Sequence, residues 1–272
     1  MKKTVKNLIT WSPCHLITSP KSAFTLAEVL ITLAIIGVVA AMTIPTLISN
    51  YKEKATITKV LKAYSNINNV YQMAKAEHGN INQWGFPGNS STGSYDEEGN
   101  YIINPNTAAN APLFWSKMTP YMKVISQCNR GDQNCKYPKV TRLNETYIDL
   151  NTLSIIELAD GTTMFGGWMN NINCNGSTQV CGDFAIDING SKTSPNTIGK
   201  DIFYFNVTQN AIIPMGKDGI KGSSRRFPAD CNLTSTSDYN GYACTVWIIE
   251  NKNMDYLHCN DLSWNGKRKC SD

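Results

Sequence analysis

The sequence predicts an α+β fold in which a long N-terminal helix packs on a small antiparallel-sheet head. Three observations predict it. Residues 24–48 are almost entirely apolar, residues 57–74 carry apolar side chains at intervals of three and four, and short segments typical of strands follow residue 146. We therefore expect the first half of the helix to span a membrane and the second half to bury one amphipathic face against the head.

A basic leader precedes the apolar run. Residues 1–23 contain four lysines and no acidic residue, and an excess of positive charge is expected on the cytoplasmic side of a membrane. We therefore expect the leader to face the cytoplasm and the C-terminal bulk to lie outside it. The whole chain has 25 Lys plus Arg and 21 Asp plus Glu, so without these four lysines the two signs balance. A chain with no basic surplus is not expected to bind nucleic acid.

The apolar run of residues 24–48 has Glu28 as its only charge and is long enough to cross a hydrocarbon core of about 30 Å. Three interpretations compete. A secretory signal peptide, cut for example after Ala41, has an apolar region of roughly 7 to 15 residues, which is shorter than this run. A plain single-pass anchor leaves Glu28 unexplained, because a charge in the hydrocarbon region is costly. The third interpretation is cleavage of the chain before the apolar run.

The segment from Ala23 to Leu30, AFTLAEVL, favours this third interpretation. It resembles the class III leader junction of type IV pilins and type II secretion pseudopilins, although the family usually has glycine at the position of Ala23. The resemblance implies that the leader is cut between Ala23 and Phe24 and that the new terminus, Phe24, is N-methylated. Glu28 then becomes the fifth residue of the mature chain, where the family keeps its acid. A buried carboxylate is tolerable when a cation pairs with it, so the freed amine of a neighbouring subunit would pair with Glu28 and select the register of a filament.

Pro45 lies inside the apolar run, at the twenty-second residue after the expected cut. Many pilins have a proline there, and proline removes a backbone hydrogen bond and loosens a helix. Under the resemblance Pro45 therefore lets the helix curve or melt locally when subunits pack in a filament. The alternative is that Pro45 simply ends the membrane helix near the interface, and the sequence leaves both open.

The second half of the helix, residues 49–79, is expected to be amphipathic. Its apolar stripe consists of Ile57, Val60, Leu61, Tyr64, Ile67, Tyr71 and Ala74. Gly79 is the expected C-terminal cap. A helix over residues 24–77 would be roughly 80 Å long, and a coiled coil is disfavoured because the stripe keeps no strict heptad.

The head is expected to begin after a variable surface loop, residues 80–111, which is rich in Gly, Asn, Ser, Thr and Pro. Residues 112–272 form the expected globular head. Residues 111–124 predict a short helix with Phe114, Met118 and either Tyr121 or Met122 facing inward. The expected strands are 146–150, 154–158, 162–165, 184–188 and 203–207, with Asp160-Gly161 as a tight hairpin. Residues 242–250 fit a strand or a buried helix.

The cysteines predict disulfides. Nine cysteines occur, and Cys14 lies in the leader, so its removal leaves an even number, which suits an oxidising compartment. Among the many connectivities that eight cysteines allow, we choose the pairing of neighbours along the chain. The expected pairs are Cys128 with Cys135, Cys174 with Cys181, Cys231 with Cys244, and Cys259 with Cys270.

Zinc and a catalytic cysteine are both disfavoured. No Cys-x-x-Cys occurs, and the three histidines, His15, His78 and His258, are scattered along the chain. No cysteine has a histidine and an orienting acid at a recognisable spacing. We therefore expect the chain not to be an enzyme, and we expect no cofactor beyond a weak case for calcium.

That case concerns residues 183–205, DFAIDINGSKTSPNTIGKDIFYF. This stretch resembles a segment of pseudopilin heads, some of which bind calcium in a nearby loop. Asp183, Asp187 and Asn189 are the candidate oxygen ligands. The alternative, which we favour, is a loop whose Asp and Asn side chains satisfy their own backbone.

The expected function is that of a prepilin-like structural subunit in a type II secretion pseudopilus or a type IV pilus. The resemblance implies a leader peptidase and methyltransferase, an assembly ATPase with its membrane platform, and copies of the chain or sister pilins as partners. It places the chain in the bacterial inner membrane with the leader in the cytoplasm, and then in a periplasmic or surface filament. The alternatives are a membrane-anchored or secreted binding protein that never polymerises and a secreted enzyme.

Overall fold

A computed structural model describes residues 25–91, 94–98, 101–102, 104–129, 135, 137, 139–148 and 154–271 of the chain. The chain divides into two compact units. The first ends at Ser49 and the second begins at Asn50. The second unit, called the head below, contains the sheet and the disulfides.

Helix α1 (Leu26–His78) has 53 residues, which confirms the predicted long helix. Gly79 follows the last residue of the helix and forms the expected C-terminal cap. Its φ is +77°, and its N–H donates to the Lys75 carbonyl oxygen at 2.9 Å. The side chains that α1 buries all lie in its second half. They are Val60, Ala63, Ile67, Tyr71 and Ala74.

The head is built on a six-stranded antiparallel sheet with the strand order β10-β9-β8-β7-β6-β3. Its strands are β3 (Val124–Cys128), β6 (Ser154–Leu158), β7 (Thr163–Trp168), β8 (Val180–Asp187), β9 (Ile202–Thr208) and β10 (Ile212–Pro214). Two small ribbons pair β1 (Ser94–Tyr95) with β2 (Tyr101–Ile102) and β4 (Val140–Thr141) with β5 (Tyr147–Ile148). The α+β fold class is therefore confirmed.

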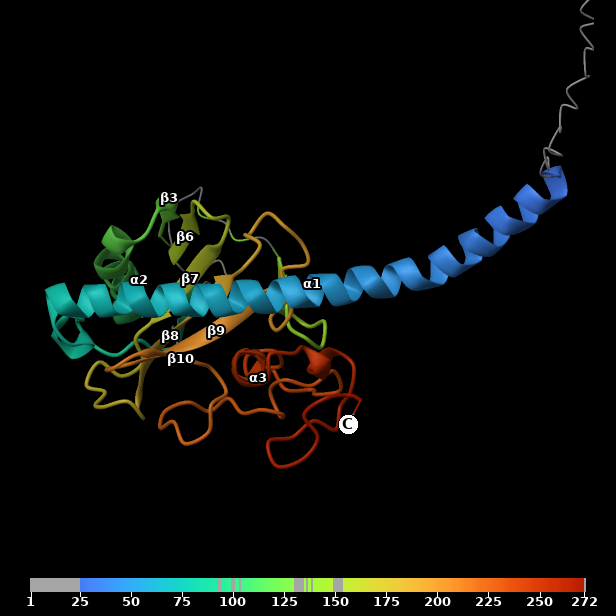
Figure 1. The fold of residues 1–272 in the computed structure, drawn as a ribbon. Helices are drawn as coiled ribbons and strands as arrows, with labels where there is room; N and C mark the ends of the chain where they lie inside the picture. The colour runs from blue at the N-terminus through green and yellow to red at the C-terminus, as the bar shows by residue number, and fades with distance from the viewer. Residues whose placement is uncertain are drawn as a thin grey trace, which may run out of the picture. The chain divides into compact units, whose positions relative to one another are not determined.

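The part of α1 that belongs to the head lies across the sheet (Figure 1). The Tyr71 hydroxyl donates to the carbonyl oxygen of Thr208 at the end of β9, at 2.7 Å. The Asn68 side-chain oxygen accepts the N–H of Ile212 at the start of β10, at 3.0 Å. These contacts fix α1 along β9 and β10, because each one satisfies a backbone group at a strand end.

Helix α2 (Pro105–Met118) begins six residues before the predicted start, within the segment expected to be loop. The Asn104 side chain accepts the N–H of Asn106, and Pro105 stands in the first turn, where a missing N–H costs nothing. Phe114 and Met118 are fully buried as predicted. A 3-10 turn, η2 (Thr119–Tyr121), follows α2 and contains Pro120.

The expectation of a surface loop over residues 80–111 is also wrong at its start. A 3-10 turn, η1 (Ile81–Gln83), follows α1, and Ile81, Trp84 and Phe86 are buried in the main core. Trp84 packs against Tyr71 and Phe114, with ring centroids 5.9 and 6.0 Å away. The segment is rich in polar residues, so its composition alone predicted a surface loop. Burial of its three large apolar side chains orders the chain between α1 and α2.

A glycine in β7 allows α2 to approach the sheet. Gly167 has a φ of +97°, and a Cβ there would lie 3.2 Å from the Cα of Ala111. The Trp115 indole N–H donates to the carbonyl oxygen of Gly166 at 2.9 Å. A side chain at position 167 would therefore push α2 away from β7.

The sheet is buried on both faces at its centre, where every residue of β9 is buried. Phe184 and Phe205 face the core that contains α1 and α2, whereas Ala185 and Tyr204 face a second cluster, to which Tyr242 belongs. Double burial explains why the first four residues of β9, Ile202 to Phe205, are all apolar or aromatic rather than alternating with polar residues.

The remaining predictions for the head hold in part. Four of the five predicted strands correspond to β6, β7, β8 and β9, whereas the predicted strand 146–150 is described only as the two-residue β5, and residues 149–150 lie outside the described residues. The ambiguous segment 242–250 is a helix, α3 (Cys244–Asn251), which ends at Lys252 with a φ of 55°. Strands β3 and β10 were not predicted.

Candidate assembly surface

The first half of α1 exposes its apolar side chains. No residue of its most apolar 18-residue window is buried, and the helix is long and apolar enough to cross a membrane. Leu33, Ile36 and Leu47 are 59%, 62% and 70% exposed. An apolar surface of this extent is stable only in lipid or against other protein.

The only acid of this segment, Glu28, is bonded to the residue that precedes α1. One carboxylate oxygen of Glu28, Oε2, accepts the backbone N–H of Thr25 at 2.8 Å and the Thr25 hydroxyl at 2.9 Å. The Glu28 N–H points back to the Thr25 hydroxyl oxygen at 3.2 Å. This reciprocal arrangement is a capping box, which satisfies helix N–H groups that have no partner within the helix.

Of the other residues expected to act in processing and assembly, the structure describes only Pro45. Ala23 and Phe24 lie outside the described residues. Pro45 is exposed and lies within α1, which continues for more than 30 residues beyond it. Pro45 therefore does not end α1, and the local effect of Pro45 is the loss of one backbone hydrogen bond within the helix.

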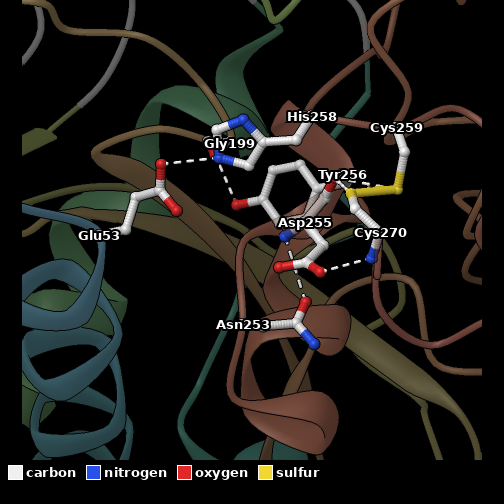
Figure 2. Close-up of polar contacts among 8 residues, drawn as sticks. All are labelled: Glu53, Gly199, Asn253, Asp255, Tyr256, His258, Cys259 and Cys270. Carbon is white, nitrogen blue, oxygen red and sulfur yellow. Dashed lines mark hydrogen bonds and ion pairs between the residues drawn. A yellow bond between two sulfur atoms is a disulfide. The ribbon is translucent and has the colours of Figure 1, made fainter. Parts of the chain in front are cut away.

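A polar cluster joins the C-terminal part of the head to α1 (Figure 2). His258 Nε2 lies 2.8 Å from Glu53 Oε1. Glu53 belongs to the part of α1 that lies in the head, because the first unit ends at Ser49. The Tyr256 hydroxyl, in the 3-10 turn η3 (Asp255–Leu257), donates to the carbonyl oxygen of Gly199 at 2.7 Å. Asp255 accepts the N–H of Cys270 at 2.7 Å. These bonds tie the C-terminal segment to α1 and to the loop before β9.

The head contains four disulfides, and they are the neighbour pairs expected from the sequence. They join Cys128 to Cys135, Cys174 to Cys181, Cys231 to Cys244, and Cys259 to Cys270. Cys231 and Cys244 are in the main core, and Cys259 and Cys270 are half-buried. With all eight thiols in disulfides, a nucleophilic cysteine has no place in the head.

Two of the three calcium candidates come together, and they bond to the protein itself. Asp187 Oδ1 accepts the N–H groups of Asn189 and Gly190, at 3.1 and 3.0 Å, and Asp187 Oδ2 accepts the Tyr137 hydroxyl at 2.8 Å. The Asn189 amide nitrogen donates to Asp201, 3.3 Å away. Burial is the main reason that the pKa of Asp187 is raised to about 6, and the neighbouring Asp201 adds to it.

Asp201 was not among the sequence candidates, yet it organises the same loop. Its carboxylate accepts the N–H groups of Asn196 and Thr197 at 2.9 and 2.6 Å. Burial also raises the pKa of Asp201. The carboxylates of Asp187 and Asp201 therefore have donors within the loop between β8 and β9, whereas the side-chain oxygens of Asn189 and Asn196 in the same loop are buried and have no hydrogen-bond partner among the described residues.

Asp183, the third calcium candidate, stands apart from the other two. It lies four residues before Asp187 on β8, which corresponds to roughly 13 Å along a strand. Its carboxylate accepts the side-chain N–H of Asn170 at 3.1 Å, and burial raises its pKa to about 6. Among the residues that the structure describes, no group of three His, Cys, Asp or Glu side chains could hold a metal ion.

Sequence reasoning assigned no role to Thr25, Glu53 or His258. The capping box had a readable signal, because Thr25-Leu-Ala-Glu28 fits the pattern of Ser or Thr followed three residues later by Glu. The pair of Glu53 and His258 had no signal in the sequence, because the two residues are 205 positions apart.

Comparisons with known proteins agree with the two-part structure. Residues 18–44 match the prokaryotic N-terminal methylation motif, which is the signature of type IV pilins and pseudopilins. Residues 46–245, well over half of the chain, match a family of unknown function, DUF6613. No curated protein and no solved structure matches the chain. The chain is therefore a member of the DUF6613 family that carries the N-terminal methylation motif of type IV pilins and pseudopilins.

Proposed function

We propose that the chain is a prepilin-like structural subunit that is processed, methylated and assembled into a type II secretion pseudopilus or a type IV pilus. The observation that carries the proposal is the unburied first half of α1, in which Glu28 is the only charge and which coincides with the methylation motif. In a filament, neighbouring helices would replace lipid around this surface.

Glu28 supplies the specificity of that assembly. A carboxylate among apolar helices is costly when alone and tolerable when a cation pairs with it. Cleavage between Ala23 and Phe24 would create such a cation at the N-terminus of every subunit. The amine of Phe24 in one subunit would then pair with Glu28 of its neighbour, and this pair would fix the stagger between the two helices.

The proposal includes the machinery that such a subunit needs. A leader peptidase and methyltransferase would process the N-terminus, and an assembly ATPase with a membrane platform would insert the subunit beside copies of itself or sister pilins. Before assembly, the chain would span the inner membrane with the leader in the cytoplasm. The head and its four disulfides would then stand in an oxidising compartment.

Replacement of Glu28 by Ala tests the proposal. We expect Glu28→Ala chains to remain in the membrane fraction and to be absent from sheared filaments. The matched control is Glu97→Ala, which removes an exposed acid from the head and should assemble as the unaltered chain does. Normal assembly of Glu28→Ala would contradict the role that we propose for Glu28, whereas absence of the unaltered chain itself from sheared filaments would favour a membrane-anchored binding protein that does not polymerise.

We further propose that the head functions without a bound cofactor and that Asp187 and Asn189 close the loop before β9. The protein donors on Asp187 and Asp201 support this. We expect millimolar calcium to leave the melting temperature of the full chain in detergent unchanged. A rise that Asp187→Asn abolishes would instead establish a calcium site.

A further inference from the structure

The C-terminal segment, residues 252–271, packs beside the first turns of α1 within the head, as its red trace shows in Figure 1. The contact between His258 and Glu53 is one point of attachment. Side chains between positions 50 and 57 of α1 also line a pocket together with residues 252–255. The C-terminal segment therefore lies where the chain of α1 enters the head.

The basic run at residues 267–269, Lys-Arg-Lys, is held against this segment. Asp255 accepts the N–H of Cys270, which closes the last disulfide of the chain. The Asn253 side chain donates to the carbonyl oxygen of Arg268 at 3.1 Å. A run that is distant in sequence from α1 is thus brought to the start of the head.

Basic residues are concentrated at this end of the head. Residues 50–54 and 252–271 together carry six Lys or Arg and three Asp or Glu. The chain after residue 23 carries 21 of each, so the remainder has 15 basic and 18 acidic residues. The balance of the two signs in the whole chain therefore conceals an uneven distribution.

The three acids of this region have partners within it, whereas four of its lysines are exposed. Glu53 contacts His258, Asp261 pairs with Lys267 at 3.2 Å, and the third acid accepts the N–H of Cys270. Among the described residues, no acid lies within 4.0 Å of the amines of the four exposed lysines. These four, called the basic surface below, are Lys52, Lys54, Lys252 and Lys269.

The start of the head follows the apolar segment directly along the chain. The second unit begins at Asn50, and Tyr51 is 73% exposed. Tyrosine is enriched where a membrane meets water. Lys54 follows Tyr51 by three residues, which is about 5 Å of helix. Because charges act over about 8 Å at physiological salt, Lys52 and Lys54 are within reach of headgroup charges at that interface.

We propose that the basic surface binds the anionic phospholipid headgroups of the membrane that the apolar segment spans, and holds the head against the bilayer before assembly. The inference rests on the membrane placement in the proposed function and not on polymerisation. A lysine ammonium is a compact charge that pairs with phosphate oxygens. Each lysine near an anionic surface is expected to favour the bound head about fivefold.

The test uses the full chain in nanodiscs of phosphatidylcholine alone or with one third phosphatidylglycerol. A water-soluble acylating reagent modifies exposed lysines, and mass spectrometry of proteolytic fragments gives the rate at each one. Lys252 and Lys269 report on the basic surface. Lys139 and Lys221, which are exposed and outside it, are the internal controls.

We expect phosphatidylglycerol to slow acylation of Lys252 and Lys269 about fivefold and to leave Lys139 and Lys221 unchanged. Molar salt should remove the difference, because charges then act over only about 3 Å. Equal rates in the two lipids would overturn the inference, and so would equal slowing of all four lysines. Equal slowing by soluble glycerol phosphate, with phosphatidylcholine nanodiscs, would also overturn it and indicate a site for a free anion.

A double variant tests whether the start of α1 takes part. Lys52→Gln with Lys54→Gln should remove most of the slowing at Lys252 and Lys269. The matched control, Lys62→Gln with Lys117→Gln, removes two charges outside the basic surface and should retain it. Full slowing in the first variant would overturn the inference.

The same experiment separates this inference from the proposed function. A chain that does not enter nanodiscs would overturn the membrane placement and the inference with it. A chain that enters nanodiscs and shows equal rates in the two lipids would overturn the inference alone.

Discussion

The two halves of α1 belong to one helix but differ in whether the rest of the chain buries their apolar side chains. Before Asn50 the apolar side chains lie all around the helix, and none is buried. After Asn50 they form a stripe, and Ile67, Tyr71 and Ala74 are at most 1% exposed against the head. The first half thus depends on an environment outside the chain, whereas the second half is part of a core that the chain supplies itself.

The comparison shows that length and continuity of a helix say little about where its stability comes from. An isolated helix in water is marginal, and packing of an apolar face supplies most of its stability. The head provides that packing through the sheet and α2. For the first half, lipid or neighbouring subunits provide it.

Loss of a buried disulfide is expected to have the largest effect, confined to the head. Replacement of both Cys231 and Cys244 by Ala should lower the free energy of unfolding by about 4 kcal/mol, because the bridge closes a loop of 13 residues and its sulfurs lie in the main core. Denaturant unfolding of the full chain in detergent, followed by near-ultraviolet circular dichroism, measures this. The matched control replaces Cys259 and Cys270, whose loop of 11 residues is similar but whose side chains are half-buried, and should cost about 2 kcal/mol. Equal losses would contradict the role that we give to core burial.

A pair of isoleucines compares the two halves of α1 directly. Ile67→Ala should lower the free energy of unfolding of the head by about 3 kcal/mol, because Ile67 is 1% exposed and its removal leaves a cavity. Ile36→Ala, the same change at a side chain that is 62% exposed, should leave the head unchanged in the same unfolding measurement. A comparable loss in Ile36→Ala would mean that the head depends on the membrane half.

The stability of the head should fall as the pH rises through 6. Burial raises the pKa of Asp187 from its ordinary 3.8 to about 6, so folding favours the protonated acid. Its contribution is fully present below the unfolded pKa and is lost above the folded one, which corresponds to about 2 kcal/mol between pH 4 and 7. Unfolding at several pH values should show this slope, and Asp187→Asn should make it shallower. The slope that remains comes from Asp183 and Asp201, because burial raises the pKa of these carboxyl groups too. The exposed Asp238→Asn is the control and should leave the slope unchanged.

The smallest effect is expected for the contact between His258 and Glu53. His258→Ala should change the free energy of unfolding by less than about 1 kcal/mol, because the His258 side chain is 48% exposed and water screens the pair. Tyr256→Phe removes a buried hydrogen bond two residues away and should cost more, about 1.5 kcal/mol. The opposite ranking would show that the exposed pair, rather than the buried hydroxyl, holds the C-terminal segment.

Sequence periodicity predicted the parts of the fold that local patterns determine. The long helix, its buried stripe and its glycine cap follow from spacing over a few residues, and the neighbour disulfides span short loops. Strand β6 was predicted at its observed bounds because its apolar run is flanked by polar residues and a tight turn.

The rest depends on contacts between distant residues. Trp84 and Phe86 are ordered by packing against α1 and α2, which no local pattern reveals within a polar segment. Residues 242–250 form a helix because Trp247 stacks on Phe227, with ring centroids 4.1 Å apart, in the core beside the sheet. In the candidate assembly surface, Glu28 was found from a motif, and its bond to Thr25 had a readable signal in the spacing of the two residues. The contact between Glu53 and His258 had no such signal and required the structure.

The intact mass and N-terminal residue of the native protein, extracted from membranes, test the central claim most directly. We predict a chain that begins at N-methylated Phe24, with Glu28 as its fifth residue and with all eight remaining cysteines oxidised. A chain that begins near Thr43, or that still begins at Met1, would contradict processing before the apolar run. The first half of α1 would then be a signal peptide or a simple anchor rather than an assembly helix.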